Sequence, residues 1–188
     1  MNFILIIGPP AVGKMTVGQC LSELSGYKLF HNHQSIDFTL QYYDWGTPEF
    51  KSINEGIRQL MFRTAAESKR LKGLIFTLVW AFDEKSDWNY VEELEQKFVE
   101  NGWKFYIVEL YAPLSKRLVR NTSANRLLYK RSKRNLQKST KNLKSLENSY
   151  QMSSKGSLEN RSNYLFVDNS DLTPERVSKL IFTHFKLK

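Results

Sequence analysis

Near its start the chain reads Gly8-Pro9-Pro10-Ala11-Val12-Gly13-Lys14-Met15-Thr16, directly after the apolar run Phe3–Ile7. This stretch fits the pattern GxxxxGK of a phosphate-binding loop up to its last position. The two glycines let the backbone fold around a phosphate with several N–H groups pointing inward, and Lys14 reaches the transferable phosphate. Apolar residues then recur at helical spacing. The sequence therefore predicts a strand, a phosphate-binding loop and a helix whose N-terminal end adds positive potential.

One position of the loop departs from the pattern. Met15 stands where a serine or threonine hydroxyl normally ligates Mg²⁺, and a thioether is a poor ligand for so hard a cation. Thr16 carries the nearest hydroxyl. A strand-to-helix turn without a ligand is the alternative interpretation, but the full spacing favours nucleotide binding. The loop residues that we expect to bind the nucleotide are Gly8, Pro10, Ala11, Val12, Gly13, Lys14, Met15 and Thr16.

Length and composition indicate one domain. With 188 residues and 41% hydrophobic content, the chain can bury a sizeable core over residues 1–188. No apolar run approaches the roughly 20 residues needed to span a bilayer, and the start lacks the basic region of a signal peptide. We expect a cytoplasmic protein without membrane contact, either a monomer or a homodimer. The single cysteine, Cys20, excludes an internal disulfide and is expected to pack in the core.

The net charge of +9 is concentrated in one part of the chain. Between Lys116 and Leu146 no residue is acidic, and the rest of the chain is slightly acidic. A block this basic is typical of a contact with a polyanion or of a solvated segment. We place it in a segment over residues 114–150 of the single domain. Its eleven cations are Lys116, Arg117, Arg120, Arg126, Lys130, Arg131, Lys133, Arg134, Lys138, Lys141 and Lys144.

Strand-like and helix-like segments alternate along the chain. Helices are expected over 36–43, from Pro48, over 88–100, from Pro113 and from Pro174; Thr47 and Thr173 are predicted caps. Because right-handed crossovers join parallel strands, the pattern predicts an α/β fold with three layers, in which a five-stranded parallel sheet carries helices on both faces. The strands are expected at residues 3–7, 27–30, 74–80, 104–110 and 164–168.

This layout resembles that of the small P-loop kinases, a group that contains shikimate kinase, gluconate kinase, adenylate kinase and chloramphenicol phosphotransferase. The segment from Leu110 through Ala112, Pro113, Arg117 and Arg120 to Arg126-Leu127-Leu128 is similar to the one that such kinases carry after their fourth strand. The resemblance implies ATP and Mg²⁺ as cofactors and a basic helical lid over 114–150. It also implies that Arg120, or otherwise Arg117, packs on adenine and that Arg126 contacts the phosphates from the lid.

The loop after the last predicted strand, residues 168–175, is similar to the loop with which these kinases hold adenine. The resemblance therefore adds Asn169 and Ser170 to the predicted nucleotide-binding residues.

The acceptor side differs from that of shikimate kinase. His31-Asn32-His33-Gln34 and Trp80-Ala81-Phe82-Asp83 stand where that enzyme carries two aspartates and a glycine triplet, so shikimate is not the expected substrate. Aromatic residues gather in this half of the chain, which favours a planar or apolar-faced acceptor such as a nucleoside, another metabolite or an antibiotic. Each of these aromatic residues taken singly is more often part of a core.

Phosphoryl transfer needs a group that positions or deprotonates the acceptor hydroxyl. Asp83 directly follows the third predicted strand and is our first choice for the base and, with Thr16, for holding Mg²⁺; Asp37 comes next. For both, a helix-capping aspartate is the alternative. The predicted catalytic residues are Lys14, Asp83, Arg126 and His33.

His31 and His33 alternate along a predicted strand end, so both could face the same side. No third histidine or cysteine is near enough in sequence to complete a zinc site. We expect His33 to face the acceptor cleft and to gain charge near neutral pH, with a surface histidine as the alternative.

Three functions fit the sequence. The leading hypothesis is an ATP-dependent kinase that transfers the γ-phosphate to a hydroxyl of a small molecule. In the second, the basic segment binds nucleic acid and ATP gates that binding, which predicts a steep dependence on salt. In the third, the protein binds nucleotide without catalysis, and Met15 is the observation that supports it.

Overall fold

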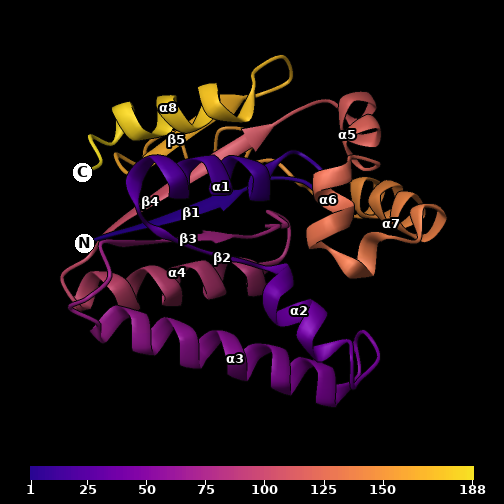
Figure 1. Cartoon of the computed structure of the whole chain (residues 1–188), viewed down its shortest axis with the longest axis horizontal. Coiled ribbons are helices and arrows are strands. Elements are labelled where there is room, and N and C mark those ends of the chain that lie inside the picture. Colours follow the sequence, from indigo (N-terminus) through magenta and orange to yellow (C-terminus); the bar gives the residue numbers. More distant parts are fainter.

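The computed structural model describes all of residues 1–188 and contains one sheet of five parallel strands. The spatial order of the strands is β2-β3-β1-β4-β5, so the first strand in sequence, β1, lies at the centre. Figure 1 shows the sheet edge-on between two layers of helices, which confirms the predicted three-layer architecture. The strands are β1 (Asn2–Ile7), β2 (Lys28–His31), β3 (Gly73–Thr77), β4 (Lys104–Tyr111) and β5 (Tyr164–Asp168).

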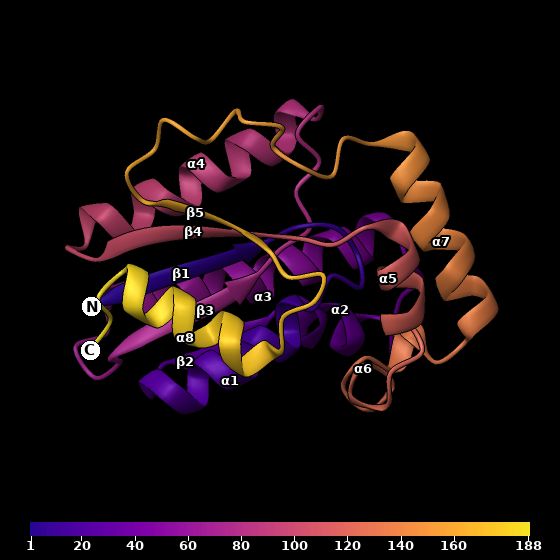
Figure 2. The same ribbon diagram turned by 90° about the horizontal axis from the view of Figure 1, so that it is seen from above.

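Helices α1 (Lys14–Ser25) and α8 (Pro174–His184) cover one face of the sheet, and α3 (Pro48–Glu67) and α4 (Lys85–Glu100) cover the other (Figure 1). The short helix α2 (His33–Thr39) follows β2. Between β4 and β5 the chain forms four further helical elements beyond the carboxyl ends of the strands, at the side remote from both termini (Figure 2). These are α5 (Leu114–Arg120), α6 (Ala124–Tyr129), the 3₁₀ helix η1 (Arg131–Lys133) and α7 (Leu136–Ser149).

The alternation of side chains along β1 builds both halves of the core. Phe3, Leu5 and Ile7 face the cluster under α3 and α4, whereas Ile4 and Ile6 face the cluster under α1 and α8. All five side chains are fully buried. Because both faces of the central strand are covered, β1 reads as an uninterrupted apolar run, as strands of parallel sheets do.

The predicted starts of two helices are confirmed in detail. The Thr47 hydroxyl accepts a hydrogen bond from the backbone N–H of Phe50, and the Thr173 hydroxyl accepts one from that of Arg176. Each threonine is followed by a proline in the first turn, where no backbone N–H is needed.

Some element boundaries differ from those expected. Strand β3 ends at Thr77, and the apolar residues after it are buried in a loop over α4, where the Trp80 and Phe82 rings stack at 4.6 Å. Their apolar character therefore reflects packing and not strand structure. Helix α2 begins at His33, so the prediction that His31 and His33 share a strand end is wrong. No helix has the length and the apolar character that crossing a bilayer requires.

Gly8 allows the end of β1 to approach the end of β4. A Cβ at this position would lie 2.3 Å from the carbonyl oxygen of Leu110, and the φ angle of +131° strains any L side chain.

We expect Gly8→Ala to lower the free energy of unfolding by about 2 kcal/mol or more, measured as the urea midpoint. Gly56→Ala is the control, because Gly56 lies within α3 and a Cβ there meets no atom within 4 Å. It should stabilise the chain by about 0.5–1 kcal/mol. Equal effects of the two changes would contradict this account.

Candidate functional site

The loop between β1 and α1 has the backbone of a ligand-binding turn. Gly8 and Gly13 adopt φ angles of +131° and +114°, and Ala11 is one of the few non-glycine residues with a positive φ. The Lys14 ammonium group donates to the carbonyl oxygens of Gly8 and Pro9 at 2.5 and 2.9 Å. Two of its three N–H donors thus fix it across the loop, and one remains for a ligand.

A cavity of about 300 Å³ lies over this loop. Its walls come from the loop and the start of α1, from the segment at the end of α5 and in α6, and from the residues that join β5 to α8. The polar residues that line it are Lys14, Thr16, Arg120, Ser123, Asn125, Arg126, Lys130 and Asn169. The structure therefore brings residues 11–16 of the predicted loop together with Arg120, Arg126 and Asn169, whereas Gly8 and Pro10 do not line the cavity.

The charge of this cavity is positive throughout. Lys14, Arg120, Arg126 and Lys130 line it, and none of its 15 lining residues is acidic. The four ion pairs of the chain involve none of these four side chains. A cluster of cations without a carboxylate is complementary to a ligand that carries several negative charges.

The pKa values of these side chains reflect burial and mutual repulsion. Burial holds the pKa of Lys14 well below its ordinary value, and the charges of Lys130, Arg126 and Arg117 lower it further. Burial, together with Arg126 and Lys133, lowers the pKa of Lys130 to about 7. Burial alone lowers the pKa of Arg126 to about 10. A neighbouring anion would raise each of these pKa values and so favour the charged form.

The Val12 carbonyl oxygen joins the loop to two other parts of the site. It accepts hydrogen bonds from the Arg120 guanidinium and from the Asn169 amide, both at 2.9 Å. The same guanidinium donates to the backbone carbonyls of Asn169 and Ser170 at 2.7 and 3.0 Å. Arg120 thus fixes the end of α5, the phosphate-binding loop and the β5–α8 loop in one arrangement.

Arg117 and Ser170 lie outside the cavity lining. The Arg117 side chain is buried, forms an ion pair with Glu147 at 2.6 Å and donates to the Ala112 carbonyl. The Ser170 hydroxyl and backbone N–H both donate to the Asp168 carboxylate. Both side chains stabilise the segments that frame the cavity, and their direct contact with a nucleotide stays a prediction.

Helix α6 is attached to α1 by a residue that sequence reasoning missed. The Asn125 amide donates to the Thr16 hydroxyl and to Gln19 Oε1, both at 3.0 Å. One residue further on, Arg126 Nε donates to Asn121 Oδ1 at 3.0 Å, which directs the arginine along the cavity wall. The α6 part of the basic segment therefore lies over the loop.

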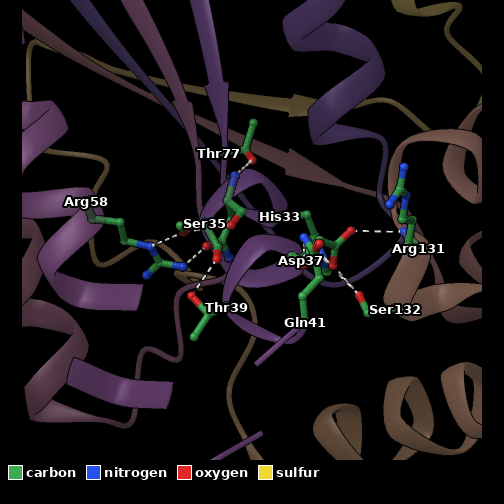
Figure 3. Close-up of polar contacts among 10 residues, drawn as sticks. His33, Ser35, Asp37, Thr39, Gln41, Arg58, Thr77, Arg131 and Ser132 are labelled. Atoms are coloured by element: carbon green, nitrogen blue, oxygen red, sulfur yellow. Dashed lines mark hydrogen bonds and ion pairs between the residues drawn. The ribbon is translucent and has the colours of Figure 1, made fainter. Parts of the chain in front are cut away.

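A second attachment holds η1 against α2 (Figure 3). Figure 3 shows the Asp37 carboxylate between His33 on its own helix and two residues of η1. The carboxylate accepts hydrogen bonds from the Arg131 backbone N–H at 3.0 Å and from the Ser132 hydroxyl at 2.6 Å. Because Lys130 directly precedes Arg131, this anchor fixes the position from which Lys130 enters the cavity. The carboxylate of Asp37, our second choice for the catalytic base, is therefore hydrogen-bonded to η1.

His33 lies beside the same carboxylate, with Nδ1 3.3 Å from Asp37 Oδ1. Burial lowers its pKa to about 3 despite the hydrogen bond with Asp37, so the imidazole is neutral at pH 7. The expectation that His33 gains charge near neutral pH is therefore not supported. The pKa of His31, on β2, is lowered to about 4, also chiefly by burial.

The other polar contacts in Figure 3 fix the start of α2. The Arg58 guanidinium, from α3, donates to Ser35 Oγ at 3.1 Å and to Asn32 Oδ1. The Asn32 backbone N–H donates to Thr77 Oγ1 at the end of β3. Two buried polar groups before α2 and after β3 have no partner within the chain, namely His31 Nδ1 and Trp80 Nε1.

Asp83 is exposed and lies outside the cavity lining. Its carboxylate accepts a hydrogen bond from the Gln151 backbone N–H at 2.9 Å, in the segment that follows α7. The structure thus does not bring Asp83 and Thr16 to the same cavity. The roles of Asp83 as base and as metal ligand stay predictions.

The Asp37 anchor can be tested by hydrogen exchange. We expect Asp37→Ala to accelerate exchange of the Arg131 amide roughly tenfold or more, because a hydrogen bond to a charged group contributes about 1.5–3 kcal/mol. Asp44→Ala is the matched control, since Asp44 is exposed and its carboxylate has no such contact. Unchanged exchange at Arg131 in Asp37→Ala would show that the anchor does not hold the segment.

Comparison with known proteins establishes the fold of the chain but no sequence family. No family model matches the chain, and no curated protein matches its sequence. Among solved structures, shikimate kinase from Acinetobacter baumannii in complex with shikimate aligns at 16% identity with a TM-score of 0.61, covering 99% of this chain and 93% of that chain. A putative kinase from Chloroflexus aurantiacus aligns at 16% identity with a TM-score of 0.65, over 98% and 96% of the two chains.

The tunicamycin resistance protein of Deinococcus radiodurans is also similar, at 17% identity and a TM-score of 0.57, over 100% of this chain and 98% of that chain. Likeness at this identity establishes the fold. The chain has the α/β fold of the small P-loop kinases over nearly its whole length, which confirms the fold that the sequence predicts.

Proposed function

We propose that this protein is an ATP-dependent kinase that transfers the γ-phosphoryl group to a hydroxyl of a small molecule. The observation that carries the proposal is the convergence of Lys14, Arg126 and Lys130 on the cavity over a GxxxxGK loop, with no carboxylate to neutralise them. A site of this charge is costly to maintain unless an anion is bound in it. The triphosphate chain of a nucleotide has the length and the charge to contact all three.

The proposed reaction forms a bond between the acceptor oxygen and the γ-phosphorus while the bond to the ADP oxygen breaks. The hydroxyl proton passes to a base, for which Asp83 and His33 remain the candidates. Charge spreads over the equatorial oxygens in the transition state, so cations fixed around them lower the barrier. Arg126 and Lys130 lie on the segment that covers the loop, from where they can supply this charge.

The base end of the nucleotide is proposed to lie beside Arg120, Asn169 and Leu172, which line the same cavity. The guanidinium of Arg120 is fixed by backbone carbonyls on its edges. Its planar face stays suitable for stacking on adenine.

The acceptor is proposed to bind on the other side of the loop, among α2, α3 and the loop after β3. The unpartnered His31 Nδ1 and Trp80 Nε1 offer hydrogen bonds to a polar molecule there. A nucleoside, another metabolite or an antibiotic fits this description. The similar structures are named for shikimate, for gluconate and for tunicamycin resistance, so the shared fold does not determine the acceptor.

Binding of nucleic acid by the basic segment stays the alternative to a kinase. Arg117, Arg120, Arg126 and Lys130 are directed into the protein or the cavity, where they cannot contact a long polyanion. Six of the eleven cations are exposed and could do so, namely Lys116, Arg131, Arg134, Lys138, Lys141 and Lys144. Retention of mixed RNA on a filter at low salt would support the alternative. The cytoplasmic location and the oligomeric state stay predictions.

The phosphate contacts can be tested by substitution. We expect Lys14→Ala to abolish ATP binding, measured by calorimetry. We expect Arg126→Ala to lower turnover more than it lowers ATP affinity, where turnover is measured as ATP consumption over a panel of metabolites and antibiotics. Lys179→Ala, at an exposed position of α8, is the control and should retain the affinity of the unchanged protein. Unchanged affinity in Lys14→Ala would remove the nucleotide-binding proposal, and no turnover with any acceptor would count against catalysis.

The pH dependence of ATP affinity gives an independent test. An anion binds the protonated form of Lys130, so binding is strongest below the pKa of about 7 in the free protein and weakens as pH rises through it. Between pH 7.5 and 9, above the phosphate pKa of about 6, we expect the titration of Lys130 to lower affinity about threefold, since one charged contact contributes about tenfold in all. Lys130→Arg keeps its charge over this range, so its affinity should fall less than that of the unchanged protein, and any remaining fall is due to Lys14, whose pKa is also lowered. A pH-independent affinity in the unchanged protein would contradict the assignment of Lys130.

A further inference from the structure

The residues around the loop do not form a site for a divalent metal. Met15 lines the cavity at the position after the loop lysine, and its thioether is no ligand for Mg²⁺. The Thr16 hydroxyl already accepts a hydrogen bond from Asn125 at 3.0 Å. No acidic residue lines the cavity, and the Asp83 carboxylate is directed to the Gln151 backbone outside it. Elsewhere in the chain, no group of three or more histidine, cysteine, aspartate and glutamate side chains could hold a metal ion.

Cationic side chains line the same cavity, at the place where a metal ion would otherwise neutralise the phosphates. Lys130 and Arg126 come from the covering segment and face Lys14 from the loop. Their mutual repulsion is evident in the lowered pKa of Lys14, on which Lys130, Arg126 and Arg117 act in the same direction and no carboxylate acts in the other. A divalent cation entering this cavity would meet positive charge on every side, and it would compete with the lysines for the same phosphate oxygens.

The geometry points to a nucleotide site that neutralises the phosphates with its own side chains. We propose that the chain binds metal-free ATP at least as tightly as the Mg²⁺ complex, because Lys14, Arg126 and Lys130 contact the phosphates and no side chain ligates the metal. This inference rests on the proposal that the cavity binds ATP, and it goes beyond that proposal by assigning the neutralising charge to the protein. The Asp37 anchor contributes to this site, since it holds Arg131, and thereby Lys130, in place.

Calorimetric titration with ATP, once with excess EDTA and once with MgCl₂, tests the inference. We expect the two dissociation constants to agree within about threefold, or binding to be tighter in EDTA, since removal of the metal removes no protein contact. An affinity that falls about tenfold or more in EDTA would overturn the inference and leave the proposed function standing. Absence of binding under both conditions would overturn the proposed function itself.

Two substitutions at one position separate the role of Met15 from its packing. Met15→Leu keeps an apolar side chain of similar size and should retain equal affinities in EDTA and MgCl₂. Met15→Ser supplies the missing hydroxyl, and we expect MgCl₂ to raise its ATP affinity about fivefold or more over that in EDTA. Equal affinities in Met15→Ser would show that Met15 is not what excludes the metal. Urea midpoints of both variants identify any loss of folding.

Lys130→Gln tests whether the protein's own side chains neutralise the phosphates. It should lower ATP affinity about tenfold in both conditions, because a charge-assisted contact is lost whether or not metal is present. Lys144→Gln, at an exposed position of α7, should bind ATP as the unchanged protein does. A Lys130→Gln variant that loses affinity only in EDTA would indicate that the metal and not the lysine neutralises the phosphates, and would overturn the inference.

Discussion

The carbonyl oxygen of Val12 is the point on which the site depends. It accepts hydrogen bonds from Arg120 at the end of α5 and from Asn169 after β5, so one acceptor in the phosphate-binding loop joins three segments far apart in sequence. The close approach of Gly8 to the Leu110 carbonyl makes this possible, because it brings the ends of β1 and β4 together. The loop is thus held in shape by the groups that form the cavity walls.

Electrostatics then determines what the cavity can accept. Four cations line it without a carboxylate, and burial raises the free energy of keeping them charged. The basic segment contributes three of them, and its part from α6 to η1 is attached at two places, through Asn125 to α1 and through Arg131 and Ser132 to Asp37 on α2. An anion bound in the cavity would relieve the repulsion among these cations.

The sequence predicts the fold because the relevant signals are local. The apolar run of β1, the threonine and proline starts of α3 and α8, and the loop pattern each depend on neighbouring residues. The site was less predictable, because its cations lie in a block of eleven in which spacing does not reveal which side chains turn inward. Lys130 lines the cavity, and the next residue is held by Asp37, which is distant in sequence. The packing of Trp80 and Phe82 likewise made a buried loop resemble a strand.

The central claim is that this cavity holds the phosphates of a nucleotide. A crystal structure of the protein with a non-hydrolysable ATP analogue tests it most directly, with the side-chain nitrogens of the cavity as the atoms to examine. We expect phosphate oxygens within hydrogen-bond distance of Lys14, Arg126 and Lys130 nitrogens, and the base beside Arg120. An analogue bound elsewhere on the protein, with these nitrogens contacting no phosphate, would contradict it.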